Sequence, residues 1–139
     1  MELSDITVPA LAYLGDGVLE VCVRTYLVAE RGLSTSAHLN HASLDFVRAA
    51  AQSEAMARLE PHLTETEASV YRRGRNMGHG NVPKSASVAE YRRATGMEVL
   101  FGYLSLTGQG ERMDQLFRLG YDLPAAPLKK QSESGESLT

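Results

Sequence analysis

The spacing of apolar residues along the chain predicts an all-α protein. Apolar positions recur at intervals of three and four residues, whereas strict two-residue alternation over the length of a strand is hard to find. The first apolar segment predicts a helix from about Pro9, which suits a first turn, to about Glu30, with Gly32 as its stop. Apolar side chains cover most of its circumference, so we expect it to be the central, buried helix.

The pattern after Gly32 predicts two further helices in the first half of the chain. One is expected from about Ala37 to Leu59. Thr64 followed by Glu67 is a capping box, in which each side chain accepts a hydrogen bond from the backbone N–H of the other residue. This box predicts the start of a short helix that reaches about Arg75.

A second capping box, formed by Ser87 and Glu90, predicts a fourth helix that Gly108 closes. The last helix is expected to be amphipathic, to run from Glu111 to Leu119 and to be capped by Gly120.

Length and composition are those of one globular domain. Of the 139 residues, 43% are apolar and 22% are charged. We expect residues 1–122 to form the domain and the polar, proline-containing residues 123–139 to form a flexible tail. No apolar run approaches the ~20 residues that span a bilayer, and the N-terminus lacks a secretory signal. The sequence therefore favours a cytoplasmic protein with no membrane partner, and the lone Cys22, inside an apolar run, is typical of inert packing.

Two carboxylates occupy positions where a helix this apolar should carry hydrophobic residues. Asp16 lies in LAYLGDGVLE between Gly15 and Gly17, and Glu98 lies in TGMEVLFGYL, close to Gly102. An ionised carboxylate is costly to bury unless a cation or a metal ion offsets its charge. Glycines permit another helix or a ligand to approach closely. The sequence therefore indicates a site built around the two acids.

Two interpretations of these acids are open. Each can form a structural ion pair with an arginine such as Arg24 or Arg48, or both can supply oxygen ligands to a divalent cation, above all Mg²⁺, which commonly takes one or two carboxylates. Glu20, one turn after the aspartate, can extend the site, although pairing with Arg24 is favoured. Thr95, one turn before the glutamate, can bond a water on the ion, although a bond to its own backbone is favoured.

Positive charge is concentrated in one segment, although the whole chain has a net charge of −3. Residues 71–93 carry six basic side chains and one acid, so that segment is +5 and the remainder is −8. A polyanion is attracted by the positive charge of this segment even though the whole chain is negative. Basic residues beside a metal ion indicate a phosphodiester substrate. The residues expected to contact the phosphodiester backbone are Arg72, Arg73, Arg75, Asn76, Lys84 and Arg92, with His79 as a secondary candidate. A solvated loop without a ligand is the alternative.

With 6% aromatic residues and no tryptophan, contact with a duplex backbone is favoured over base stacking. The four histidines show no zinc-binding spacing.

Several segments resemble the ribonuclease III family. LAYLGDGVLE is similar to its signature motif, which contains a Gly-Asp pair, and GMEVLFGYL is similar to the later helix that carries a metal-binding Glu. YRRGRN, the PK that follows it and Tyr91-Arg92 resemble specifically Mini-ribonuclease III, the short bacterial branch without a double-stranded RNA-binding domain. The resemblance spans residues 11–121.

This resemblance implies a ribonuclease III-like helical endonuclease domain that forms a homodimer and cuts double-stranded RNA with Mg²⁺, for which Mn²⁺ can substitute. Asp16 and Glu98 match the catalytic, metal-binding acids. In that branch the task is maturation of the large-subunit ribosomal RNA precursor, with a ribosomal protein on the precursor as a further partner. Ala12 and Thr95 replace two other acids of the full-length family, so the number of metal ions stays open.

Three hypotheses follow. The first is a Mg²⁺-dependent endoribonuclease. The second is a catalytically inert RNA-binding protein of the same fold within a ribonucleoprotein, which the missing acids favour and the retained Asp16 and Glu98 oppose. The third is a helical protein-interaction domain whose acids form core ion pairs.

Overall fold

The structure, a computed structural model, describes residues 3–77 and 86–125, and these residues are helical with no strand, as the sequence predicted. The elements are η1 (Leu3–Asp5), α1 (Val8–Ala29), α2 (Ser36–Val47), α3 (Ala49–Leu59), η2 (Glu60–His62), α4 (Glu65–Arg75), α5 (Val88–Leu106) and α6 (Gly110–Gly120). The expected tail lies mostly outside the described residues. None of the described helices has the length and apolar character needed to cross a bilayer.

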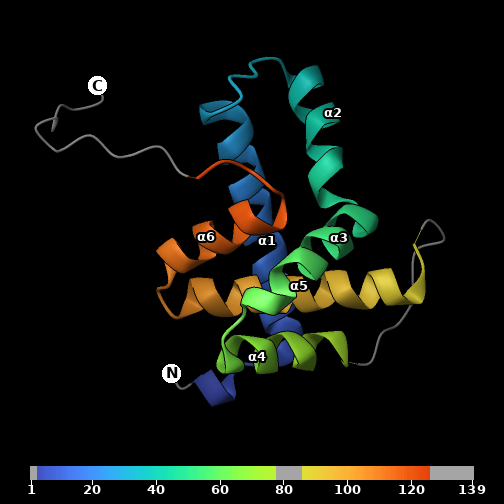
Figure 1. Ribbon diagram of the computed structural model, residues 1–139, viewed down its shortest axis with the longest axis vertical. Coiled ribbons are helices and arrows are strands. Elements are labelled where there is room, and N and C mark those ends of the chain that lie inside the picture. The colour runs from blue at the N-terminus through green and yellow to red at the C-terminus, as the bar shows by residue number, and fades with distance from the viewer. Residues whose placement is uncertain (1–2, 78–85, 126–139) are drawn as a thin grey trace, which may run out of the picture.

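Helix α5 is the centre of the molecule. It runs between α3 on one side and α4 on the other, and α1 crosses behind it (Figure 1). The expectation that the first helix is the central one was wrong. Among the described residues, only one side of α1 packs on other helices, and Tyr13, Val21 and Val28 on α1 are 86%, 64% and 56% exposed. The apolar residues around α1 therefore include a surface that the chain alone does not cover.

Most predicted helix ends are confirmed. Both capping boxes form, at the starts of α4 and α5. Thr7 caps α1 by accepting a hydrogen bond from the backbone N–H of Ala10 at 3.1 Å. Gly32 and Gly108 follow α1 and α5 with φ angles of +66° and +72°, a conformation that a residue without a Cβ adopts readily.

The helix expected over 37–59 is two helices, because the chain breaks at Arg48. The ψ angle of this residue is 148°, which ends α2 and caps α3. The break lets the buried ring of Phe46 pack against Phe117 and Tyr121, and the Tyr121 hydroxyl donates a 2.7 Å hydrogen bond to the Phe46 carbonyl. A contact across 75 residues therefore overrides the local helical pattern.

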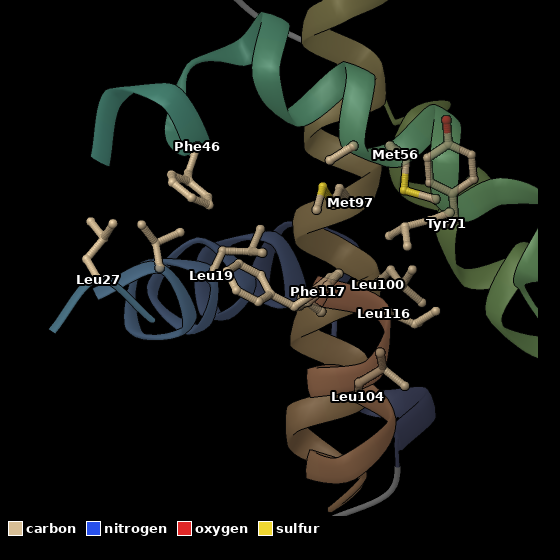
Figure 2. Packing of buried hydrophobic residues seen from close by; sticks show 14 residues of the cluster. Leu19, Leu27, Phe46, Met56, Tyr71, Met97, Leu100, Leu104, Leu116 and Phe117 are labelled. Atoms are coloured by element: carbon tan, nitrogen blue, oxygen red, sulfur yellow. The ribbon is translucent and has the colours of Figure 1, made fainter. Parts of the chain in front are cut away.

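One continuous core joins the helices. In this core Leu19 from α1 lies beside α5, which carries Met97 and Leu100, and Leu27 lies at the end of the cluster nearest Phe46, as Figure 2 shows. This packing fixes α5 as the element against which α1, α3 and α6 are positioned.

Helix α4 is held to α6 by a buried ion pair. Arg112 donates two hydrogen bonds to the carboxylate of Glu67, at 2.8 and 2.9 Å, and a third to the carbonyl of His62. The Arg112 guanidinium is the main reason why the pKa of Glu67 lies below its ordinary value. This bidentate pair fixes the helix that carries the basic residues 72, 73 and 75.

The tightest contact of the fold is the crossing of α1 and α5 at Gly15 and Gly102. A Cβ on Gly15 would overlap the carbonyl oxygen of Glu98 and lie 2.9 Å from the backbone nitrogen of Gly102. A Cβ on Gly102 would overlap the carbonyl oxygen of Leu11. The two backbones therefore touch directly, as the glycines flanking the acids indicated, whereas Gly17 faces open space.

We predict that Gly15→Ala lowers the free energy of unfolding by about 3 kcal/mol or more, because the added methyl must separate two packed backbones. Urea unfolding followed by circular dichroism measures this loss. Gly110→Ala is the matched control: a Cβ there meets nothing within 4 Å, so its effect should stay within about 0.5 kcal/mol. Equal stability of the two variants would contradict the crossing.

Candidate active site

The crossing of α1 and α5 brings the two predicted acids together. Asp16 follows Gly15 directly on α1, and the backbone of Glu98 on α5 touches Gly15. The carboxyl of Glu98 is partly buried and lies within hydrogen-bonding range of the carboxyl of Asp16, which is exposed. Side chains separated by 82 positions in the sequence therefore form one site that opens to solvent.

The two carboxyls strongly affect each other. Burial raises the pKa of Glu98 to about 8, and the neighbouring Asp16 adds to this increase through charge repulsion and a hydrogen bond. Two ionised carboxylates at this distance repel each other unless a cation lies between them. The pair is therefore a site for either a proton or a metal ion.

No basic side chain among the described residues neutralises the pair. Within the described part of the chain, neither Asp16 nor Glu98 forms an ion pair with a lysine, arginine or histidine, so the alternative of ion pairs with Arg24 or Arg48 fails there. Arg24 donates instead to Glu20 at 3.1 Å, which confirms the favoured pairing and leaves Glu20 engaged.

The other acid positions of the family contribute no ligand. Thr95 is buried, and its hydroxyl donates to the Tyr91 carbonyl at 2.9 Å, as favoured from sequence. Ala12 packs on a small apolar cluster. Residues 3–77 and 86–125 hold no group of three or more potential metal ligands, so the site has two carboxylates. Such a pair suits Mg²⁺, which takes its remaining ligands from water and substrate oxygens.

The predicted basic contacts lie on α4 and α5. Arg72 and Arg73 are exposed in the last turn of α4, and Asn76 caps this helix and accepts a hydrogen bond from Arg75 at 3.2 Å. Arg92 is exposed on α5. Lys84 and His79 lie outside the described residues.

The structure brings Arg75, Asn76 and Arg92 around one hollow, which Arg93 also lines. Arg93 was not among the RNA contacts expected from sequence. Its position beside Arg92 in a basic run was the only signal.

A second surface feature is an apolar groove along α1. Its volume is about 600 Å³, and its lining includes Gly17, Val18 and Val21 of α1 and Phe117 of α6. Cys22 also lines it, and burial, with a smaller contribution from Asp114, raises the pKa of this thiol to about 11, which keeps it protonated as expected for a packing residue.

Comparison with known proteins gives a family. The model of the ribonuclease III domain matches residues 9–109, a range that contains both acids. The chain belongs to the ribonuclease III family. Mini-ribonuclease 3 of Symbiobacterium thermophilum is 47% identical over 120 residues, covering 84% of this chain and 91% of the relative. Mini-ribonuclease 3 of Clostridium tetani is 33% identical over 133 residues, covering 96% and 88%. The resemblance to the Mini branch is thus confirmed.

A solved structure supports the fold. A crystal structure of a Fusobacterium nucleatum protein matches with a TM-score of 0.74 and 26% identity, covering 82% of this chain and 90% of that one. As a member of the ribonuclease III family, the chain is an endoribonuclease that acts on double-stranded RNA.

We predict that Glu98→Gln stabilises this ribonuclease in the absence of metal. The pKa of Glu98 is higher in the folded protein than in the unfolded protein. The contribution of this carboxyl to the free energy of unfolding is therefore complete below its unfolded-state pKa and is lost as the pH rises toward about 8. Glutamine mimics the protonated acid. The free energy of unfolding of Glu98→Gln should therefore exceed that of the wild type by an amount that grows with pH to roughly 1–4 kcal/mol. Urea unfolding in EDTA between pH 4.5 and 8.5 measures it. Glu20→Gln is the control, and equal pH dependence of wild type and Glu98→Gln would refute the interaction.

Proposed function

We propose that this ribonuclease cuts both strands of an RNA duplex with Mg²⁺, or Mn²⁺ in its place, held by Asp16 and Glu98. The observation that carries this proposal is the convergence of the two acids at the α1–α5 crossing with no basic partner in the described residues. A core ion pair would have a cation of its own, and a purely structural role would not require a carboxyl whose pKa is raised to about 8.

The chain's own residues supply position and charge. Asp16, exposed, presents its carboxylate to the substrate side, and Glu98, partly buried, is fixed from behind by α1. Bound Mg²⁺ would activate water for attack on a phosphodiester and stabilise the leaving oxygen. Arg72, Arg73, Arg75, Asn76 and Arg92 would bind the phosphates on either side and so orient the scissile bond, with Lys84 and His79 as further contacts.

A second copy of this chain is the proposed occupant of the groove on α1. The groove is apolar, Tyr13 and Val21 on the same helix are largely exposed, and the lining of the groove includes Gly17, the residue next to Asp16. A contact between two α1 helices would cover these residues and place two acid pairs in one particle. Each copy would then cut one strand of the duplex.

The proposed cellular role is the one that the sequence resemblance to the Mini-ribonuclease III branch implies. We assign to this chain the maturation of the large-subunit ribosomal RNA precursor in the cytoplasm, with a ribosomal protein bound to the precursor as a further partner. Its test is the length of the precursor ends in cells that lack the protein. Unprocessed ends should accumulate, and normal ends would exclude this role.

We predict that Glu98→Gln reduces duplex cleavage by roughly 10³-fold or more, the scale at which an enzyme loses a member of its catalytic group. Binding of the same labelled duplex should remain within a few-fold of wild type. Mg²⁺ should raise the thermal midpoint of the wild type and not that of the variant, since only the wild type gains a ligand. Glu20→Gln should cleave normally. Wild-type cleavage by Glu98→Gln would remove the acid pair from catalysis.

We predict that Val21→Asp converts the protein to a monomer, because a charge would be buried at the centre of the proposed contact between copies. Size-exclusion chromatography with light scattering gives the mass, and a strand-specific label shows whether double-strand cleavage falls. Leu44→Asp, on α2 and 37% exposed, is the control. A dimer that survives Val21→Asp would move the interface elsewhere.

A further inference from the structure

The end of α4 and the beginning of α5 enclose a positively charged hollow. Its volume is about 400 Å³, and its lining residues are Arg75, Asn76, Val88, Ala89, Arg92 and Arg93. None of these residues is acidic. The acid in the first turn of α5, Glu90, accepts a hydrogen bond from the backbone N–H of Ser87 in the capping box. The hollow therefore concentrates positive charge without a carboxylate in its lining.

Buried hydroxyl groups hold two of the three arginines. Arg93 donates a 2.6 Å hydrogen bond to the hydroxyl of Ser53 on α3, which is 3% exposed. Arg75 lies over the ring of Tyr71, which is 1% exposed, and hydrogen-bonds with its hydroxyl. A hydroxyl orients a guanidinium without neutralising it. Both arginines are thus fixed before a ligand arrives, which lowers the entropy lost on binding.

Two arginines of the hollow, Arg92 and Arg93, are not held by a carboxylate in the part of the chain that the structure describes. Among the ion pairs within the described residues, neither Arg92 nor Arg93 takes part. Arg93 uses one N–H on Ser53, and a guanidinium has five. The first turn of α5 also lines the hollow, and its partial positive charge favours an anion.

The hollow is separate from the acid pair. Arg92 and Arg93 precede Glu98 by six and five residues on the same helix, which corresponds to about 8–9 Å along the axis. An anion in the hollow would therefore be a different group from the phosphodiester at the acids. Because both sites lie on α5, an RNA strand bound at one is held at a fixed distance from the other.

We propose that this hollow binds a single backbone phosphate of the RNA duplex, away from the cut, and that Arg93, positioned by Ser53, is one of its ligands. This inference rests on the proposed function. It adds Arg93 as a phosphate ligand and Ser53 on α3 as the residue that positions it. Arg75 and Arg92 complete the clamp. Its role is to set the register of the duplex, so its loss weakens binding and leaves the chemical step intact.

The test measures binding of a labelled, perfectly paired RNA duplex in EDTA at several salt concentrations. Arg93→Gln, which removes the charge and keeps a polar side chain, should weaken binding about 10-fold and reduce the slope of log K against log salt by about one. Ser53→Ala should weaken binding less and leave the slope unchanged, because the charge remains. With Mg²⁺, both variants should raise KM and keep kcat.

Controls separate charge from fold. Arg31→Gln makes the same charge change in a different hollow and should bind as wild type. Arg92→Gln alters an exposed side chain and should reproduce the reduced salt slope even if Arg93→Gln unfolds. A wild type that cleaves while Arg92→Gln and Arg93→Gln bind normally overturns this inference and the phosphate contact proposed for Arg92, and it leaves the proposed role of the acid pair intact. A wild type that neither binds nor cleaves the duplex overturns the proposed function as well.

Discussion

The direct contact between the backbones of α1 and α5 determines where the two acids of the proposed catalytic site meet. Gly15 and Gly102 let the helices approach until main-chain atoms touch, and this approach carries the carboxyl of Asp16 to that of Glu98. A larger residue at position 15 or 102 would push the two helices apart. It would therefore separate the acids without changing either acidic side chain. The position of the site is therefore a property of packing as much as of the two acidic side chains.

The acid pair carries a cost that fits its proposed role. Burial beside a like charge makes ionised Glu98 unfavourable in the isolated chain, and a hard cation reverses that penalty. Local instability of this kind is typical of sites that bind an ion, whereas residues selected for stability alone tend to be paired or apolar. The bidentate Glu67–Arg112 pair in the same molecule illustrates the structural alternative.

The parts of the fold that depend on local sequence were predictable. Both capping boxes, the stop at Gly32 and the pairing of Glu20 with Arg24 follow from interactions within four residues, and all are present. The association of the acids was inferred from their unusual setting and from family resemblance, and their contact is confirmed, although their catalytic role stays a prediction.

Features that depend on distant contacts were not predictable. The break at Arg48 accompanies a hydrogen bond from the Tyr121 hydroxyl to the Phe46 carbonyl, and Arg93 donates a hydrogen bond to Ser53, 40 positions earlier. The exposed side of α1 was mistaken for core because an apolar helix face has the same sequence pattern whether it packs within one chain or remains uncovered.

The crossing also constrains how this sequence can diverge. At positions 15 and 102 an added methyl group would meet the main chain of the opposite helix, and the main chain is the same for every residue type. No substitution of a neighbouring side chain can make room for it. Among homologues these two positions should therefore each be invariant and show no covariation with each other.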